Sequence, residues 1–161
     1  MSWIVNGEIY NHKALKVLID AQTPSSSDSE VVGYLYRKFG TNTPTLLDGM
    51  FAFILFDKEQ GTVFAARDHM GICPLYVAYG HDGSVWFSSE MKSFTNEPRI
   101  ARYEIFPPGH YYHGGPGTVN GFVRWYNPSW MESSVIPSRP ADLAAIRTTL
   151  IDAVVKRLMV R

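Results

Sequence analysis

Asn6 and Gly7 are the first residues whose types and spacing suggest chemistry. They follow a short apolar run, residues 3–5, that is typical of a buried strand. A strand that ends there would present a side-chain amide beside a glycine N–H, which a ligand can approach closely. Two donors aimed at one point suit the negative oxygen that forms when an amide is hydrolysed. Asn-Gly is also a strong hairpin signal, and these residues alone favour a type I′ turn.

Asp28 is a second candidate, and it lies at the predicted start of a helix. Residues 27–30 read Ser-Asp-Ser-Glu, a capping-box pattern in which Ser27 caps the helix and Glu30 reaches back. An acidic residue at that place is ordinarily a cap or a favourable first-turn charge. Sequence alone therefore favours a structural role for Asp28.

The pair Arg67-Asp68, at the end of a predicted strand, could be catalytic or a buried ion pair. The structural interpretation is favoured, with Asp68 bonding backbone groups of a turn that Gly71 completes. Cys73 is the single cysteine of the chain, so it excludes an internal disulfide. Its apolar neighbours indicate a core thiol rather than a nucleophile.

Three other kinds of site are disfavoured. His110 and His113 are spaced three apart, but they stand among strand and turn residues, so no metal site is predicted. A terminal Ser2 could be activated by its own amine, yet it lies on the same strand as Asn6 rather than across a substrate from it. The sequence contains no Gly-rich phosphate loop.

Composition excludes several partners. Fifteen basic and fifteen acidic residues cancel without a basic stripe, so nucleic acid is not expected. The longest apolar run, residues 50–56, is too short to span a bilayer, so no membrane is expected either. A lone cysteine fits a reducing compartment, and a cytoplasmic location is predicted.

The elements that would position these residues mix helices and strands. Helices are predicted over residues 10–21 and from the capping box to a stop at Gly40. Two hairpins follow: strands at 50–56 and 62–66 form the first, and a strand that ends at residue 79 pairs with 84–89 in the second. One helical turn at 90–94 and weaker strands at 99–126 come next. This order describes an α+β layered domain.

The C-terminal part of the chain changes character. Residues 127–139 are rich in Pro and Ser and predict a linker. Pro140 suits the first position of a helix over 140–161 whose apolar residues form one stripe. This helix is expected to be the first element of a further domain.

The motifs together resemble the glutaminase domain of the glutamine-hydrolysing asparagine synthetases, which are class II amidotransferases of the N-terminal-nucleophile type. The resemblance covers essentially the whole chain. It rests on the order and spacing of residues 5–12, 27–30, 47–53, 67–71, 74–76, 89–92, 106–110, 124–126 and 154–159.

The resemblance implies a fold and a set of site residues. The fold would be a four-layer αββα sandwich that lacks its first strands, over residues 1–126. Asn6 and Gly7 would form an oxyanion hole as the catalytic groups, and Gly7 and Glu8 would also line the glutamine pocket. Asp28 would hold the α-ammonium of glutamine by a charge-assisted contact.

The chain departs from the family pattern at its beginning. The family's nucleophile is an N-terminal cysteine, and an arginine after it grips the α-carboxylate; nothing before Met1 supplies either group. Cys73 does not replace the missing thiol. The chain alone is therefore expected to hydrolyse no glutamine and to bind no cofactor. ATP and Mg²⁺ are expected only for a synthetase domain beyond residue 161.

Two hypotheses follow. In the first, the chain is a fragment of an asparagine synthetase that converts glutamine, aspartate and ATP to asparagine, glutamate, AMP and diphosphate. Its partners would be glutamine, the synthetase domain and a second copy in a parent homodimer. In the second, the chain is a non-catalytic module that binds glutamine or docks a partner. An amidotransferase of the hexosamine or purine type is disfavoured by the linker and last helix.

Overall fold

The computed structural model describes residues 1–20, 26–117, 121–131 and 140–158. Contacts divide the chain into two units, Met1–Tyr126 and Asn127–Arg161. The described part of the second unit contains a 3-10 turn, η3 (Ser129–Met131), and helix α4 (Leu143–Arg157). Part of the predicted linker, residues 132–139, lies outside the described residues.

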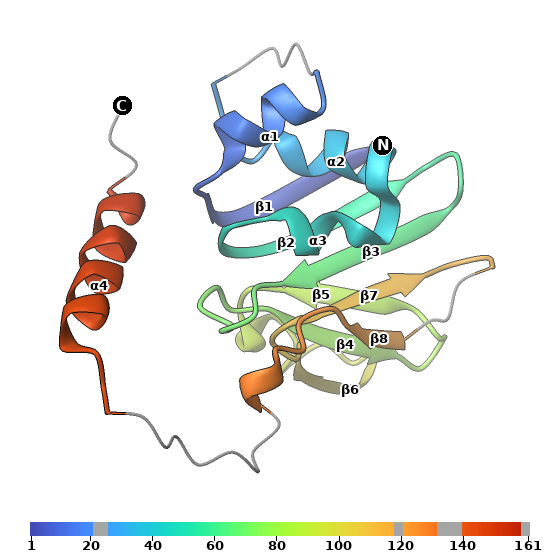
Figure 1. Ribbon diagram of the computed structural model, residues 1–161. Helices are drawn as coiled ribbons and strands as arrows, with labels where there is room; N and C mark the ends of the chain where they lie inside the picture. The colour runs from blue at the N-terminus through green and yellow to red at the C-terminus, as the bar shows by residue number, and fades with distance from the viewer. Residues whose placement is uncertain (21–25, 118–120, 132–139, 159–161) are drawn as a thin grey trace. The chain divides into compact units, whose positions relative to one another are not determined.

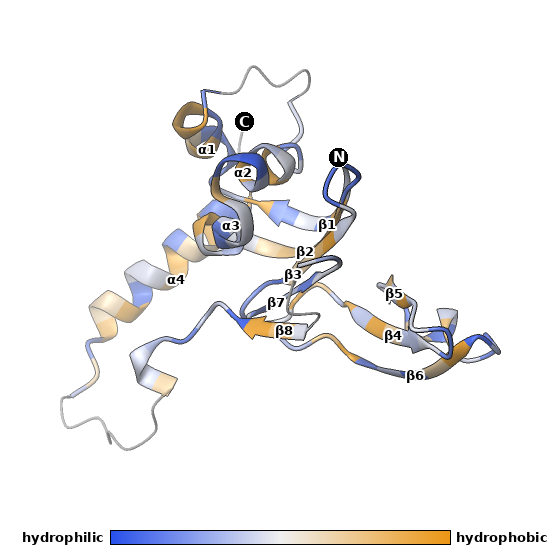
Figure 2. Ribbon diagram, turned by 90° about the vertical axis from the view of Figure 1, so that its right-hand side faces the viewer, coloured by the Kyte–Doolittle hydropathy of each residue, from blue (hydrophilic) through white to orange (hydrophobic). Residues whose placement is uncertain are grey.

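Helix α4 begins later than Pro140 suggested. Its N-cap is Asp142, whose carboxylate accepts the N–H of Ala145 at 2.9 Å. Capping by this side chain fixes the start of the helix at Leu143. Hydrophilic and hydrophobic residues alternate along α4 (Figure 2). Among the described residues, no helix combines the length and the apolar character needed to cross a bilayer.

The first unit is built on two antiparallel sheets (Figure 1). One sheet has the order β1-β2-β3-β7-β8 and consists of β1 (Ser2–Ile9), β2 (Gly49–Asp57), β3 (Thr62–Arg67), β7 (His110–Gly114) and β8 (Gly121–Arg124). The other has the order β5-β4-β6 and consists of β4 (Tyr76–Gly80), β5 (Val85–Ser88) and β6 (Ile100–Ile105). Strand β1 is therefore an edge strand.

Helices cover one face of the five-stranded sheet, and the three-stranded sheet lies on the other side (Figure 1). The helical layer comprises α1 (His12–Leu18), α2 (Val31–Phe39), the 3-10 turn η1 (Gly40–Asn42) and α3 (Thr43–Leu46). A further 3-10 turn, η2 (Met91–Ser93), precedes Phe94, which packs on Tyr103 of β6. The α+β class is thereby confirmed.

Strand β2 supplies both hydrophobic cores. Phe51, Phe53 and Leu55 point to the helical side, where they pack with residues of α1 and α2. Ala52 points to the other side and joins the core between the two sheets, which includes Val77 and other buried residues. A strand that is apolar at nearly every position is what such a two-sided environment requires, as the sequence predicted for residues 50–56.

Three local predictions are wrong. Asn6-Gly7 is not a turn: β1 runs straight through it and pairs Gly7 with Phe51 of β2. Helix α1 covers His12–Leu18 rather than residues 10–21. The capping box is not formed as predicted, since α2 begins at Val31 and its N-cap Glu30 makes no side-chain cap hydrogen bond. The stop at Gly40 is confirmed by the positive φ of 56° there.

Substituting Gly49 by alanine tests the close approach of β1 and β2. A Cβ at this position would lie 2.1 Å from the backbone oxygen of Glu8 and 3.1 Å from the Cα of Ile9. Neither atom can rotate away, so the strands must separate. We expect Gly49→Ala to lower the free energy of unfolding by about 3 kcal/mol, or to abolish cooperative unfolding.

Gly40→Ala is the control for this substitution. Its Cβ would meet no atom within 4 Å, and only the backbone conformation, φ 56° and ψ −132°, opposes the substitution, so a loss of about 1–3 kcal/mol is expected. Urea unfolding followed by circular dichroism measures both variants. An unchanged free energy of unfolding in Gly49→Ala would show that β1 and β2 have room for a side chain at residue 49.

Candidate functional site

The free edge of β1 carries the backbone groups of Gly7. On the other side of β2, the N–H of Phe51 donates to Asp68 Oδ2 at 3.2 Å, and its C=O accepts the N–H of Asp68 at 2.8 Å. The polar groups of Phe51 therefore point away from β1. Since Gly7 is the residue opposite Phe51, the two form a non-hydrogen-bonded pair. The N–H of Gly7 consequently faces the open edge of the sheet.

Asp28 lies at the same edge. Its Oδ2 accepts the N–H of Ile9 at 2.7 Å, and its Oδ1 accepts the hydroxyl of Ser29 at 3.4 Å. Ile9 follows Gly7 by two residues on β1, and backbone N–H groups two residues apart point to the same edge of a strand. Both N–H groups therefore point to the open edge. The prediction of Asp28 as a cap of its own helix is wrong, because its carboxylate crosses to the strand.

Contacts between Trp3 of β1 and the start of α2 fix the position of Asp28 beside the strand. The indole Nε1–H of Trp3 donates to the backbone oxygen of Ser29 at 3.1 Å. Gly33 of α2 lies against the indole ring so closely that a Cβ would be 2.6 Å from it. A glycine on the helix and a tryptophan on the strand thus set the separation between α2 and β1, and with it the position of Asp28.

Asn6 and Glu8 flank Gly7 on β1. The side chain of Asn6 is exposed, and among the described residues no hydrogen bond to its amide is present. Glu8 is partly buried, and its charge acts on the nearby Cys73 thiol. The structure therefore brings Asn6, Gly7, Glu8 and Asp28 together along one stretch of strand edge, although Asp28 is distant in sequence.

Gly7 has to be glycine. Its φ is +125°, which other residues rarely adopt. A Cβ there would lie 2.0 Å from the backbone oxygen of Met50 and 2.9 Å from Cys73 Sγ. The backbone of β2 and the thiol of Cys73 are thus packed directly against Gly7 on the side away from the open edge.

Asp68 and Arg67 build this packing. The carboxylate of Asp68, which is 1% exposed, accepts backbone N–H groups from Phe51, Met70, Ile72 and Cys73 at 3.0–3.2 Å. The Arg67 guanidinium, in a residue 8% exposed, donates to the backbone oxygens of Gly71, Cys73 and Phe106 at 2.7–2.8 Å. The structural interpretation of this pair is confirmed: both charges are satisfied by backbone groups.

A family model for the glutamine amidotransferase domain matches residues 1–105 of the chain. The chain belongs to the glutamine amidotransferase domain family. Among curated proteins, it is 49% identical over 156 residues to asparagine synthetase [glutamine-hydrolyzing] 3 of Arabidopsis thaliana. It is 47% identical over the same length to asparagine synthetase [glutamine-hydrolyzing] 2 of Oryza sativa subsp. japonica. The resemblance found in the sequence is thereby confirmed.

The matches differ in the share of each protein that they cover. The two synthetases align with 96% of this chain, but the chain spans only about a quarter of their length, 26% and 25%. A solved glutamine phosphoribosylpyrophosphate amidotransferase from B. subtilis superposes with a TM-score of 0.62 and 23% identity, covering 77% of this chain and 29% of that one. This likeness shows the N-terminal-nucleophile fold of the amidotransferase domain.

Several residues that shape the open edge of β1 were not predicted from the sequence. Asn11 ties the strand edge to the loop before β2: its Nδ2 donates to the oxygen of Leu46 at 2.9 Å, and its Oδ1 accepts the N–H of Asp48 at 3.0 Å. Trp3 was predicted only as part of a buried strand, and no role was predicted for Gly33. A glycine in the middle of a predicted helix was the signal that could have indicated the close packing.

The other candidate residues lie apart from the edge of β1. His110 Nδ1 contacts the oxygen of Pro108 at 2.8 Å, and His113 faces the hydroxyl of Tyr36 at 3.4 Å. Among the residues that the structure describes, no group of three His, Cys, Asp or Glu side chains could hold a metal ion. Ser2 lies four residues from Asn6, about 14 Å along β1.

Cys73 should react slowly with alkylating reagents in this amidotransferase domain. Burial, with a smaller contribution from the charge of Asp68, raises the pKa of its thiol, and the thiolate is the reactive form. We expect iodoacetamide to modify Cys73 about tenfold or more slowly in the folded chain than in urea. Mass spectrometry of quenched samples measures both rates, with a peptide of residues 70–76 as the reference. Equal rates would contradict the buried position.

Proposed function

We propose that the unit Met1–Tyr126 binds glutamine along the open edge of β1. The side-chain amide of Asn6 and the N–H of Gly7 would hold the δ-carbonyl oxygen, and would stabilise it as an oxyanion if a nucleophile attacked. Asp28 would hold the α-ammonium, and Glu8 would line the pocket. The observation that carries this proposal is that Gly7 and the Asp28 carboxylate lie on the same edge of one strand.

The spacing of these groups suits glutamine. Residues 7 and 9 are two peptide units apart on an extended strand, so their N–H groups are about 7 Å apart. Glutamine has five bonds between its α-nitrogen and its δ-oxygen, which span about 6 Å when extended. A carboxylate at one end and neutral N–H donors at the other match an ammonium and an amide carbonyl, respectively.

For the whole protein, we propose the reaction named for its relatives. Glutamine would be hydrolysed in the amidotransferase domain, and the ammonia would convert aspartate to asparagine in a synthetase domain that uses ATP and Mg²⁺. A cytoplasmic location and a homodimeric parent belong to the same proposal. The described residues of this chain would contribute none of the ATP or Mg²⁺ contacts.

Asp28→Asn tests the glutamine site. Asparagine keeps an oxygen for the N–H of Ile9 but loses the charge that would pair with the α-ammonium. We expect the thermal midpoint to change little and the Kd for glutamine to rise about tenfold to a hundredfold, the worth of a hydrogen bond to a charged group. Isothermal titration calorimetry measures the binding.

Asp20→Asn is the matched control for this substitution. It removes the same charge from an exposed residue after α1, at a φ of 50° that asparagine accommodates well. Its Kd for glutamine should equal that of the unchanged chain. If both variants bind equally well, Asp28 does not hold the ligand.

For the chain of 161 residues as printed, we propose binding of glutamine without hydrolysis. This expectation is the same under both hypotheses, and it rests on the buried position and raised thiol pKa of Cys73. We expect no release of glutamate from glutamine above the rate in buffer, measured with a coupled glutamate dehydrogenase assay. Glutamate release that disappears in Asn6→Ala would contradict this proposal.

A further inference from the structure

A cavity lies at the other end of β1, away from the proposed glutamine site. It has a volume of about 700 Å³ and is formed by the C-terminal end of α2 with η1, the turn between β2 and β3, and His113 of β7. Met1 borders it, whereas the proposed glutamine site lies at Gly7 to Ile9. Eight residues of extended strand place the two sites about 25 Å apart, so one ligand cannot occupy both.

The floor of this cavity is rigid and polar. The hydroxyl of Tyr36 and the Nε2 of His113 are 3.4 Å apart, and both rings pack on the buried Phe64 at centroid distances of 5.0 and 5.8 Å. Burial lowers the pKa of His113 below its ordinary value of 6.5. The neutral ring then offers one donor and one acceptor.

The charged side chains of the cavity lack partners of opposite sign. Among the described residues, Arg37 makes no ion pair or hydrogen bond, and neither does the Glu59 carboxylate. Asp57 uses only its Oδ1, which accepts the N–H groups of Glu59 and Gln60 at 3.0 and 3.3 Å. One guanidinium and two carboxylates thus line the same space without neutralising one another.

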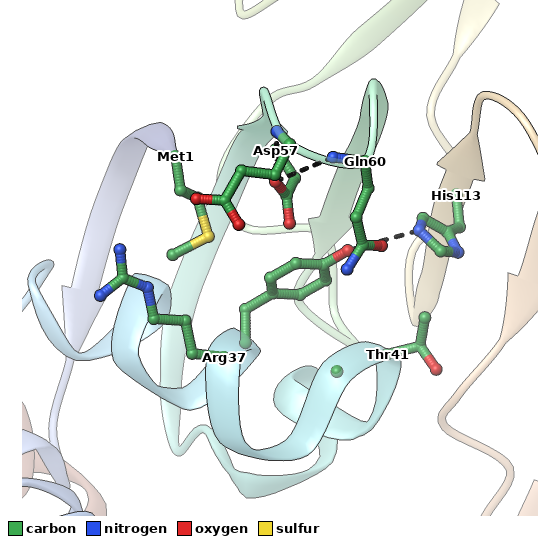
Figure 3. A pocket seen from close by; sticks show the side chains of 9 residues that line it. Met1, Arg37, Thr41, Asp57, Gln60 and His113 are labelled. Atoms are coloured by element: carbon green, nitrogen blue, oxygen red, sulfur yellow. Dashed lines mark hydrogen bonds between the residues drawn. The ribbon is translucent and has the colours of Figure 1, made fainter.

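Arg37 lies across the cavity from three neutral polar side chains (Figure 3). Arg37 and Met1 lie on one side, Asp57 lies above, and Gln60, His113 and Thr41 lie on the opposite side (Figure 3). Two carboxylates disfavour a pure anion such as phosphate, and Arg37 disfavours a pure cation. A ligand that carries one positive and one negative group can place each group beside the opposite charge and so avoids both repulsions.

We propose that this cavity binds a free amino acid with a neutral polar side chain. Its α-carboxylate pairs with Arg37, its α-ammonium pairs with Glu59 and Asp57 Oδ2, and its side chain hydrogen-bonds at the end formed by Gln60, His113 and Thr41. The site is independent of the proposed glutamine site, because no residue is shared between them.

L-asparagine is a suitable probe, since its amide side chain fits the neutral end. Two derivatives test the charges separately: N-acetyl-L-asparagine lacks the ammonium, and L-asparagine methyl ester lacks the carboxylate. We expect ¹H–¹⁵N spectra of the full chain to show shifts at residues 36–41, 57–60 and 113 with L-asparagine, and about tenfold weaker binding of either derivative.

Variants identify the site. Arg37→Ala and Glu59→Gln should each weaken binding of L-asparagine about tenfold. Lys58→Ala, which removes a cation from the same turn but does not line the cavity, should leave it unchanged. Asp28→Asn should weaken the binding of glutamine at the edge of β1 but leave unchanged the shifts that L-asparagine causes at residues 36–41. Each of the two proposals can therefore be contradicted without the other.

Two results would overturn the proposal. The first is the absence of shifts around residues 36–41 at millimolar L-asparagine in a chain whose spectrum is dispersed. The second is binding that survives Arg37→Ala and Glu59→Gln but is lost in Asp28→Asn, which would mean that all amino acids enter the edge of β1.

Discussion

The first unit depends on one buried carboxylate. The Asp68 carboxylate accepts hydrogen bonds from four backbone N–H groups, in β2 and in the loop 70–73. The neighbouring Arg67 donates hydrogen bonds to three backbone oxygens. A buried charge is tolerable only when it is hydrogen-bonded in this way. Removing one partner of such a network typically costs about 3–5 kcal/mol. The loop therefore has one stable position, with Cys73 held against Gly7.

The proposed glutamine site is a consequence of that network. Because Phe51 turns its polar groups toward Asp68, the opposite residue Gly7 turns its own toward the open edge. The wall behind Gly7 consists of the oxygen of Met50 and the sulfur of Cys73, both fixed by the same loop and strand. The buried charges of Asp68 and Arg67 thus determine that the N–H of Gly7 points to the open edge, where we propose that glutamine binds.

The sequence predicted the elements well where one local pattern decides the structure. The apolar run of β2, the hairpins and the glycine stop of α2 are of this kind. The sequence-based predictions failed where contacts between residues far apart in the chain determine the structure. Asn6-Gly7 has the local preference of a turn, but Gly7 uses its positive φ inside a strand that packs on Cys73. Asp28 has the pattern of a cap, but its partner is Ile9, far back in the chain. Family resemblance grouped these residues because their spacing, rather than their local pattern, carries the information.

Asp28 has an effect that does not involve any ligand. Strand β1 is the edge of its sheet, and an edge can accept a strand from another molecule and start aggregation. By occupying the N–H of Ile9, the carboxylate removes one of the outward donors that an added strand would need. A strand added alongside β1 could not pair beyond Ile9, because the Asp28 carboxylate occupies that place with its negative charge. The same side chain that we propose for ligand recognition therefore also limits how far the sheet can grow.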